Sequence, residues 1–72
     1  MLEIANPVIV ARSGDAVVLM PAGANPQAPQ TQGHVWTPGD GYSRLEPLQV
    51  HLKFLYYLEE VNPPQPWQEP AP

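Results

Sequence analysis

The side chains best suited to acid–base chemistry are two histidines, His34 and His51. His34 precedes a predicted turn that contains Asp40, so these two residues could pair as a base and the carboxylate that orients it. Such a pair acts on a nucleophile, and neither Ser13 nor Ser43 stands in a context that activates its hydroxyl group. We therefore expect no catalytic residues and no enzymatic activity.

The residues that bind metals are also too few and too far apart. The chain has no cysteine and two histidines, which excludes thiolate sites and histidine-rich sites. His51 and Glu59 lie on the same predicted helix, but more than two turns separate them, so they cannot share an ion without other ligands. His51 is better explained as a boundary residue beside Leu58. We expect no bound metal and no cofactor.

Two glycine-containing segments, 13–15 and 39–41, resemble ligand loops only superficially. A phosphate-binding loop has several glycines that lead into a helix, usually with a lysine, and neither segment has this arrangement. Glycine beside serine or aspartate is typical of tight turns. Both segments are therefore predicted to be turns.

The charge balance excludes two classes of partner. The net charge is −4, and Arg12, Arg44 and Lys53 are the basic side chains. Nucleic acids and anionic membrane surfaces attract clusters of lysine and arginine, which this chain lacks. No apolar run is long enough to enter a bilayer, and the N-terminus, with an acid at Glu3, lacks the pattern of a signal peptide. We expect a cytoplasmic protein, or one carried into an assembled particle such as a virion, that is not secreted by a signal peptide.

The length of 72 residues allows one small domain near the lower limit of independent stability. Small domains usually gain stability from disulfides, a metal or a neighbouring subunit. Because the first two are excluded, we expect association with protein, as a homo- or hetero-oligomer. The eleven prolines indicate an ordered core with extended arms.

The N-terminal region predicts a β-hairpin over residues 8–20. Two β-branched runs, 8–12 and 16–20, flank the turn at 13–15, and Pro7 and Pro21 bracket the pair. Neither run alternates between apolar and polar residues, which is typical of strands covered on both faces. An isolated hairpin is marginally stable, so a third strand or a helix must pack on it.

Residues 22–33 lack apolar periodicity and predict an extended linker. A short strand is predicted over 34–37. Pro38 and Gly39 suit the two central positions of a type II turn, which requires a positive φ at Gly39.

One helix is predicted over residues 47–61. The sequence from Ser43 to Glu46 matches a capping box, but that start places Pro47 where its missing N–H breaks a helical bond. Proline is favoured at the first helical position, so Pro47 is the preferred start. Pro63 and Pro64 end the helix, and residues 62–72 then form a proline-rich arm. The predicted fold is therefore α+β: residues 1–61 form one small domain, a hairpin of two or three strands packed on one C-terminal helix, with an extended linker and tail.

The predicted helix carries two apolar stripes, whereas a surface helix normally carries one. The hairpin covers one stripe, and either Trp36 and the tail fold back over the other or a partner covers it. Burial against a partner is favoured, because tyrosine and tryptophan are typical of interface hot spots. The stripes are Leu48, Leu52, Leu55 and Tyr56, and Val50, Phe54, Tyr57 and Val61. The predicted protein interface comprises Val50, Phe54, Tyr57, Val61, Trp36 and Trp67.

The function that follows is a non-catalytic structural or accessory subunit. It would dock onto a larger assembly, a virion or a multisubunit complex, through the apolar helix face and the extended arms. The alternative is a small regulator or inhibitor, such as one encoded by a phage, that binds one host protein. The tail also contains a PxxP segment, residues 63–66, but it lacks the flanking basic residue of typical ligands for SH3 domains. A disordered tail is the first expectation, an arm that lies along the partner with Trp67 as its anchor is the second, and a ligand for such a domain is the last.

Overall fold

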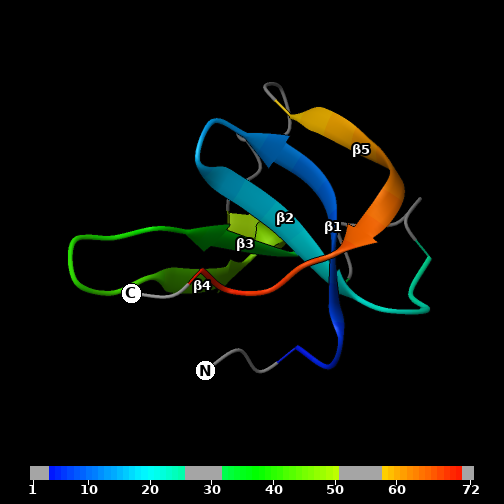
Figure 1. Ribbon diagram of the computed structural model, residues 1–72, viewed down its shortest axis with the longest axis horizontal. Coiled ribbons are helices and arrows are strands. Elements are labelled where there is room, and N and C mark those ends of the chain that lie inside the picture. The colour runs from blue at the N-terminus through cyan, green and yellow to red at the C-terminus, as the bar shows by residue number, and fades with distance from the viewer. Residues whose placement is uncertain (1–3, 26–31, 51–57, 71–72) are drawn as a thin grey trace.

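The computed structural model describes residues 4–25, 32–50 and 58–70. They form one sheet of five antiparallel strands in the order β4-β3-β2-β1-β5. The first four strands follow one another along the chain and in space, and the fifth returns to the outer side of β1 (Figure 1). The strands are β1 (Pro7–Ser13), β2 (Ala16–Pro21), β3 (His34–Thr37), β4 (Arg44–Pro47) and β5 (Glu59–Pro66).

The predicted α+β fold with a C-terminal helix is wrong, because the structure is an antiparallel sheet. Within the predicted helix, Pro47 ends β4, a 3₁₀ turn follows at residues 48–50, and Glu59 begins β5. Residues 51–57 lie outside the described residues. Residues 44–46 of the potential capping box are instead in β4, where Leu45 pairs with Trp36 on β3, and Ser43 lies just before the strand.

Leu48, from one predicted stripe, and Leu58, which a helix would have placed between the stripes, meet on one face of the sheet. Leu48 is fully buried in the larger core cluster, and Leu58 packs against the same cluster from the other end of the segment. The Leu48 backbone N–H donates to the carbonyl of Gly33, which extends the β3–β4 pairing by one residue. Leu48 and Leu58, near the two ends of the predicted helix, therefore pack in the core of the sheet.

The N-terminal hairpin is confirmed. β1 and β2 pair from Pro7–Pro21 to Ser13–Ala16 around a two-residue loop. Gly14, the first loop residue, has a φ of 58°, a conformation that glycine adopts at little cost. The predicted prolines stand at the open end of the ladder, where a missing N–H costs least.

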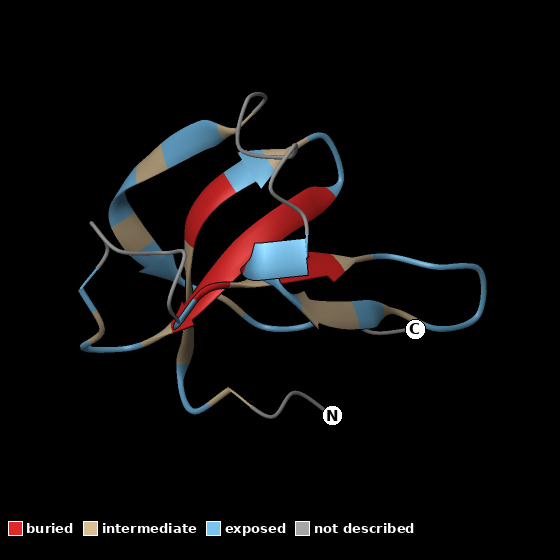
Figure 2. Ribbon diagram, turned by 180° about the vertical axis from the view of Figure 1, so that it is seen from behind, coloured by how far each residue is buried: buried red, intermediate tan, exposed pale blue. Residues whose placement is uncertain are grey.

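β2 is covered on both faces, as its sequence predicts. Its side chains from Ala16 to Met20 are all buried and alternate between two core clusters (Figure 2). The turn face, which Leu48 covers, is formed by Val10, Ala11, Ala16, Val18, Met20 and Val35, with Val8, Ala24 and Leu58 at its margin. The tail face, which Trp67 covers, is formed by Val17, Leu19 and Trp36, with Ile4, Ile9 and Leu45 at its margin.

A β-bulge at Val10 sets which side chains of β1 enter the core. The register shifts between Ile9 and Ala11, so Ala11 pairs with Val18 and Arg12 with Val17. Without the extra residue, the alternation would place Arg12 on the turn face, among buried apolar groups. The bulge keeps the guanidinium exposed on the tail-face side of β1.

The proline-rich arm predicted over residues 62–72 begins inside β5, which starts three residues earlier. β5 pairs with β1 through Glu59 and Glu60 at one end and Gln65 and Pro66 at the other. Four residues, 61–64, lie opposite the single bulged Val10, so the ladder is interrupted there. The two adjacent prolines, Pro63 and Pro64, occupy this interruption, where their missing N–H groups remove no ladder bond.

The short strand predicted over 34–37 is confirmed as β3, and its pairing with β4 forms a second hairpin. The positive φ in the loop is at Gly41 (87°), which differs from the type II turn predicted with Gly39 at that position. Part of the predicted linker, residues 26–31, lies outside the described residues. Its beginning is tied to the sheet, because the Ala22 N–H donates to the Asn6 carbonyl.

Candidate functional site

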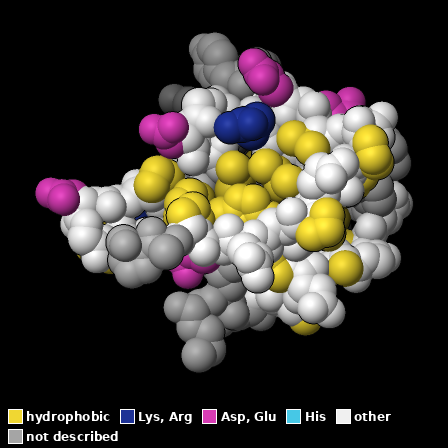
Figure 3. Space-filling view, viewed as in Figure 1, with side chains coloured by type: hydrophobic (Ala, Val, Ile, Leu, Met, Phe, Trp, Pro, Cys, Tyr) yellow, Lys and Arg dark blue, Asp and Glu magenta, His cyan; other side chains and the backbone are white. Residues whose placement is uncertain are grey.

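A pocket of about 490 Å³ opens between the loop of the β3–β4 hairpin and the segment that follows β5. Its volume falls within the range of small-ligand sites. The tail face around it carries a central group of hydrophobic side chains with acidic side chains at the rim (Figure 3). The pocket is lined by Trp36, Pro38, Gly39, Gly41, Tyr42, Ser43, Glu69 and Pro70.

Two tryptophans fasten the tail to the sheet. The rings of Trp36 and Trp67 meet edge to face, with centroids 5.0 Å apart and planes at 61°. This geometry is favourable because the positive edge of one ring faces the negative face of the other. The Trp67 backbone N–H also donates to the Pro7 carbonyl, which continues the β1–β5 pairing. The tail therefore crosses the tail face in a defined position.

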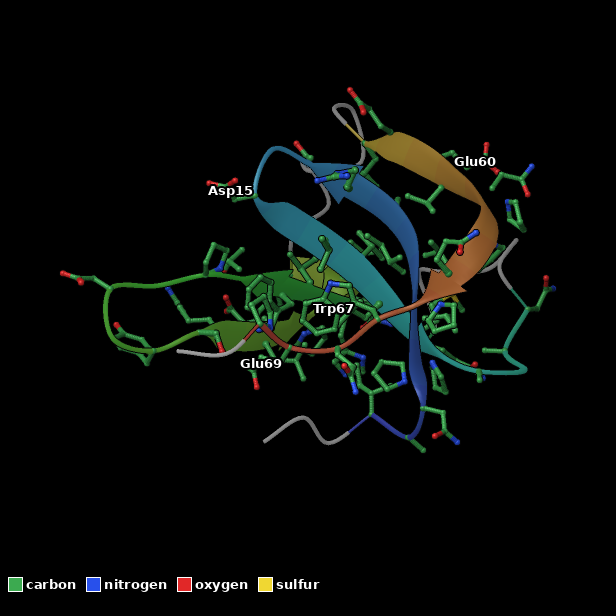
Figure 4. The ribbon with its side chains drawn as sticks, viewed as in Figure 1. Asp15, Glu60, Trp67 and Glu69 are labelled. Atoms are coloured by element: carbon green, nitrogen blue, oxygen red, sulfur yellow. The ribbon has the colours of Figure 1, made fainter. Side chains whose placement is uncertain are left out.

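Glu69 closes the pocket with a fixed carboxylate. Its Oε1 accepts a hydrogen bond of 2.6 Å from the Ser43 hydroxyl and one of 3.2 Å from the Trp36 indole N–H. The bond from Ser43, followed by the bond from Trp36, holds the pKa of Glu69 below its ordinary value, because both stabilise the charged form. Figure 4 shows Glu69 beside the β3–β4 hairpin, Asp15 at the tip of the β1–β2 hairpin and Glu60 on β5, on the far side of the molecule from Glu69.

Tyr42 forms the open wall of the pocket and is 70% exposed. The loop before it is tightly folded, since a Cβ atom at Gly39 would clash with the backbone carbonyl of Tyr42. Glycine at position 39 therefore allows the backbone of Tyr42 to pack against the loop, which places the Tyr42 side chain beside the pocket.

The structure brings together two of the six predicted interface residues, Trp36 and Trp67. Val50 is 64% exposed at the end of the 3₁₀ turn, and Val61 is half-buried on β5. Phe54 and Tyr57 lie outside the described residues. Trp36 is 7% exposed; its ring packs against Trp67 and its indole N–H donates to Glu69.

The residues considered for acid–base chemistry are dispersed. His34 begins β3, whereas Asp40 lies in the loop beyond the other end of that strand. Glu59 is on β5 opposite Arg12, and His51 is outside the described residues. Among residues 4–25, 32–50 and 58–70, no three His, Cys, Asp or Glu side chains are grouped to hold a metal ion.

None of the helical residues in the described part belongs to a helix long and apolar enough to cross a membrane.

The pocket residues that sequence reasoning missed are Tyr42, Ser43 and Glu69. A signal for the first two was present: apolar Leu45 between polar Arg44 and Glu46 is the alternation of a half-buried strand. Such a strand after a turn rich in glycine predicts a hairpin, with the preceding residues at its tip. Glu69 had no local signal, because its partners are 33 and 26 residues away along the chain.

A scan against models of protein families finds no match, and neither the curated proteins nor the solved structures contain a match to this chain.

Proposed function

We propose that this protein is a non-catalytic structural or accessory subunit that binds a protein of a larger assembly, such as a virion or a multisubunit complex. A helix face is not proposed as the docking surface, because Pro47 ends β4 and Glu59 begins β5 at the two ends of the predicted helix. The observation that supports the proposal is the pocket between the β3–β4 loop and the tail. It combines an exposed tyrosine, a tryptophan and a fixed carboxylate on the tail face.

The composition of the pocket favours a protein partner. Tyrosine and tryptophan dominate the energetics of interfaces because they bury large areas with few rotatable bonds. Tyr42 and Val50 are the large hydrophobic side chains that stand most exposed among the described residues. Tyr42 lines a concave surface, which is where a partner's side chain can be enclosed.

The sheet edges are less suited to docking. Both outer sides of the N-terminal hairpin are already paired, β1 with β5 and β2 with β3. At the edges of the sheet, β5 carries Pro63, Pro64 and Pro66, and β4 has four residues and ends at Pro47. Short strands and prolines disfavour the addition of another strand. A partner is therefore expected on the tail face and not along an edge.

Site-specific photocrosslinking in the organism that makes the protein tests this proposal. A photoreactive phenylalanine analogue at position 42 should yield one discrete adduct, whereas the same analogue at position 60 on β5 should not. The protein in that adduct, once purified, should bind the unmodified chain with a stoichiometry measurable by light scattering. No discrete adduct from position 42, or the same adducts from both positions, would argue against docking at the pocket.

A small regulator that binds one host protein is the second candidate. The observation that favours it is the coverage of the sheet: the chain's own Leu48 and Trp67 pack on its two faces, which suits a protein that folds without a permanent partner. An assembly subunit would bind in many copies, whereas a regulator would form a complex of fixed low ratio. The mass of the reconstituted complex distinguishes the two.

A further inference from the structure

The pocket beside Tyr42 presents a negative charge next to aromatic rings. Glu69 is exposed, and among the described residues its hydrogen bonds engage Oε1 alone. A carboxylate has lone pairs on both oxygens, so Oε2 can accept a further donor while Oε1 stays bound to Trp36 and Ser43. Those two donors fix the carboxylate in place before any ligand arrives.

The described cation nearest along the chain, Arg44, does not pair with this carboxylate, and the charge of the N-terminal ammonium is the smallest of the causes that lower its pKa. Arg44 follows Ser43 directly, but it pairs across the sheet with Thr37 and forms a 3.5 Å ion pair with Glu46. Strand alternation places Arg44 and Glu46 on the opposite face of β4 from Leu45, which belongs to the tail face. With a net charge of −4, the molecule as a whole also attracts positive partners.

We propose that the pocket formed by Trp36, Tyr42 and Glu69 receives the side chain of an arginine on the surface of the protein partner. A guanidinium is planar, so it stacks on an aromatic ring while its N–H groups donate to a carboxylate. It is also weakly hydrated, which lowers the cost of entering a partly apolar pocket. This inference deepens the proposed function and rests on it, since it names the chemistry by which the partner is recognised.

A titration with N-acetyl-arginine amide tests the inference without the partner. N-acetyl-citrulline amide is the matched control, because it has nearly the same shape and no charge. Binding is followed by the NMR shifts of the two indole N–H groups, Trp36 and Trp67, in the intact ¹⁵N-labelled chain. We expect the arginine compound to shift the Trp36 signal and to bind about tenfold more tightly than the citrulline compound, as a charge-assisted contact requires.

Two variants identify the carboxylate that is responsible. In Glu69→Gln, the side-chain oxygen still accepts from Trp36 and Ser43, so the pocket keeps its shape while its charge is lost. This variant should bind the arginine compound no better than the wild type binds the citrulline compound. Glu60→Gln removes the same charge from exposed β5, on the far side of the molecule from Glu69, and should retain wild-type affinity (Figure 4). Amide spectra verify that both variants are folded.

Equal binding of the two compounds, or unchanged arginine binding by the folded Glu69→Gln variant, would overturn the inference. These results are separable from the crosslinking result. An adduct from position 42 without arginine binding would retain the proposed function and refute arginine recognition. Arginine binding without an adduct would refute the proposed function and retain the cation site.

Discussion

Glu69 joins three segments that are distant along the chain. Its Oε1 accepts from Trp36 on β3 and from Ser43 just before β4, while Glu69 itself lies beyond β5. Bonds to an ionised acceptor are stronger than neutral ones, so the charge on this carboxylate strengthens the attachment of the tail. Protonation of Glu69 must weaken that attachment.

The pKa of Glu69, lowered mainly by Ser43, predicts a specific acid dependence of stability. A carboxyl group whose pKa is lower when folded stabilises the protein above its unfolded pKa of about 4.3, and this contribution disappears as the pH falls through the folded value. In Glu69→Gln, the free energy of unfolding should therefore fall less steeply as the pH drops below about 4.3. Urea titrations followed by tryptophan fluorescence at each pH measure this slope. Glu60→Gln should keep the wild-type slope, and a wild-type slope in Glu69→Gln would contradict the assignment.

Trp67 contributes to stability through its contact with Trp36. Trp67→Ala removes the edge-to-face pair and uncovers the tail face, and should lower the free energy of unfolding by about 2 to 3 kcal/mol. The loss is below that of a fully buried tryptophan because Trp67 is half-buried. Gln68→Ala, at the exposed neighbouring position, should change stability by less than about 0.5 kcal/mol. Urea unfolding measures both free energies of unfolding. Equal decreases in the two variants would show that the Trp67 ring does not stabilise the fold.

Among the elements, β1 depends on its bulge to separate apolar from charged side chains. Ala11 pairs with Val18 on the turn face and is buried, whereas Arg12 pairs with Val17 and is exposed. Ala11→Asp should therefore cost at least about 3 kcal/mol, since it buries an unpaired charge. Arg12→Ala should cost less than about 1 kcal/mol, the value of its cross-strand pairing with Glu59. Chemical denaturation measures both changes. In an unbulged register, with Arg12 on the turn face, Arg12→Ala would instead remove a buried charge and stabilise the protein.

The elements predicted correctly from the sequence are those with local signals. The hairpin over 8–20 has β-branched runs on both sides of a glycine turn, and the strand over 34–37 is bounded by glycine and proline. Burial of β2 on both faces followed from its lack of alternation. These properties depend on neighbours within a few residues, so a single sequence displays them.

The last two strands, β4 and β5, were missed because their formation depends on distant partners. Ser43 and Glu46 have the spacing of a helix cap, and nothing local shows that Leu45 will pair with Trp36. β5 has three prolines and low β-propensity. The sheet accommodates these prolines because β5 is an edge strand and lies opposite a bulge in β1. The same long-range pairing brings Glu69 to the pocket, which is why the candidate site was predicted only through its tryptophans.

At the scale of the whole molecule, residues 59–70 complete both the sheet and its tail face. A chain that lacks residues 59–72 should fail to fold, because β1 loses its outer partner and Trp36 loses its cover. A chain that lacks only residues 67–72 keeps β5 and should remain folded but less stable. Circular dichroism and amide spectra of the two truncated chains measure the difference. A folded chain without residues 59–72 would show that β5 is an accessory to a sheet of four strands.

The pairing of β5 with β1 also has a consequence for biosynthesis. Translation produces β1 about 45 residues before β5, which at cellular elongation rates is a delay of roughly 2 to 9 seconds. During that time the outer edge of β1, with its run of Val8, Ile9 and Val10, has no strand to pair with and is open to other nascent chains. Slower elongation or closely spaced ribosomes should therefore increase misassembly of this protein, and chaperones that shield nascent chains should reduce it.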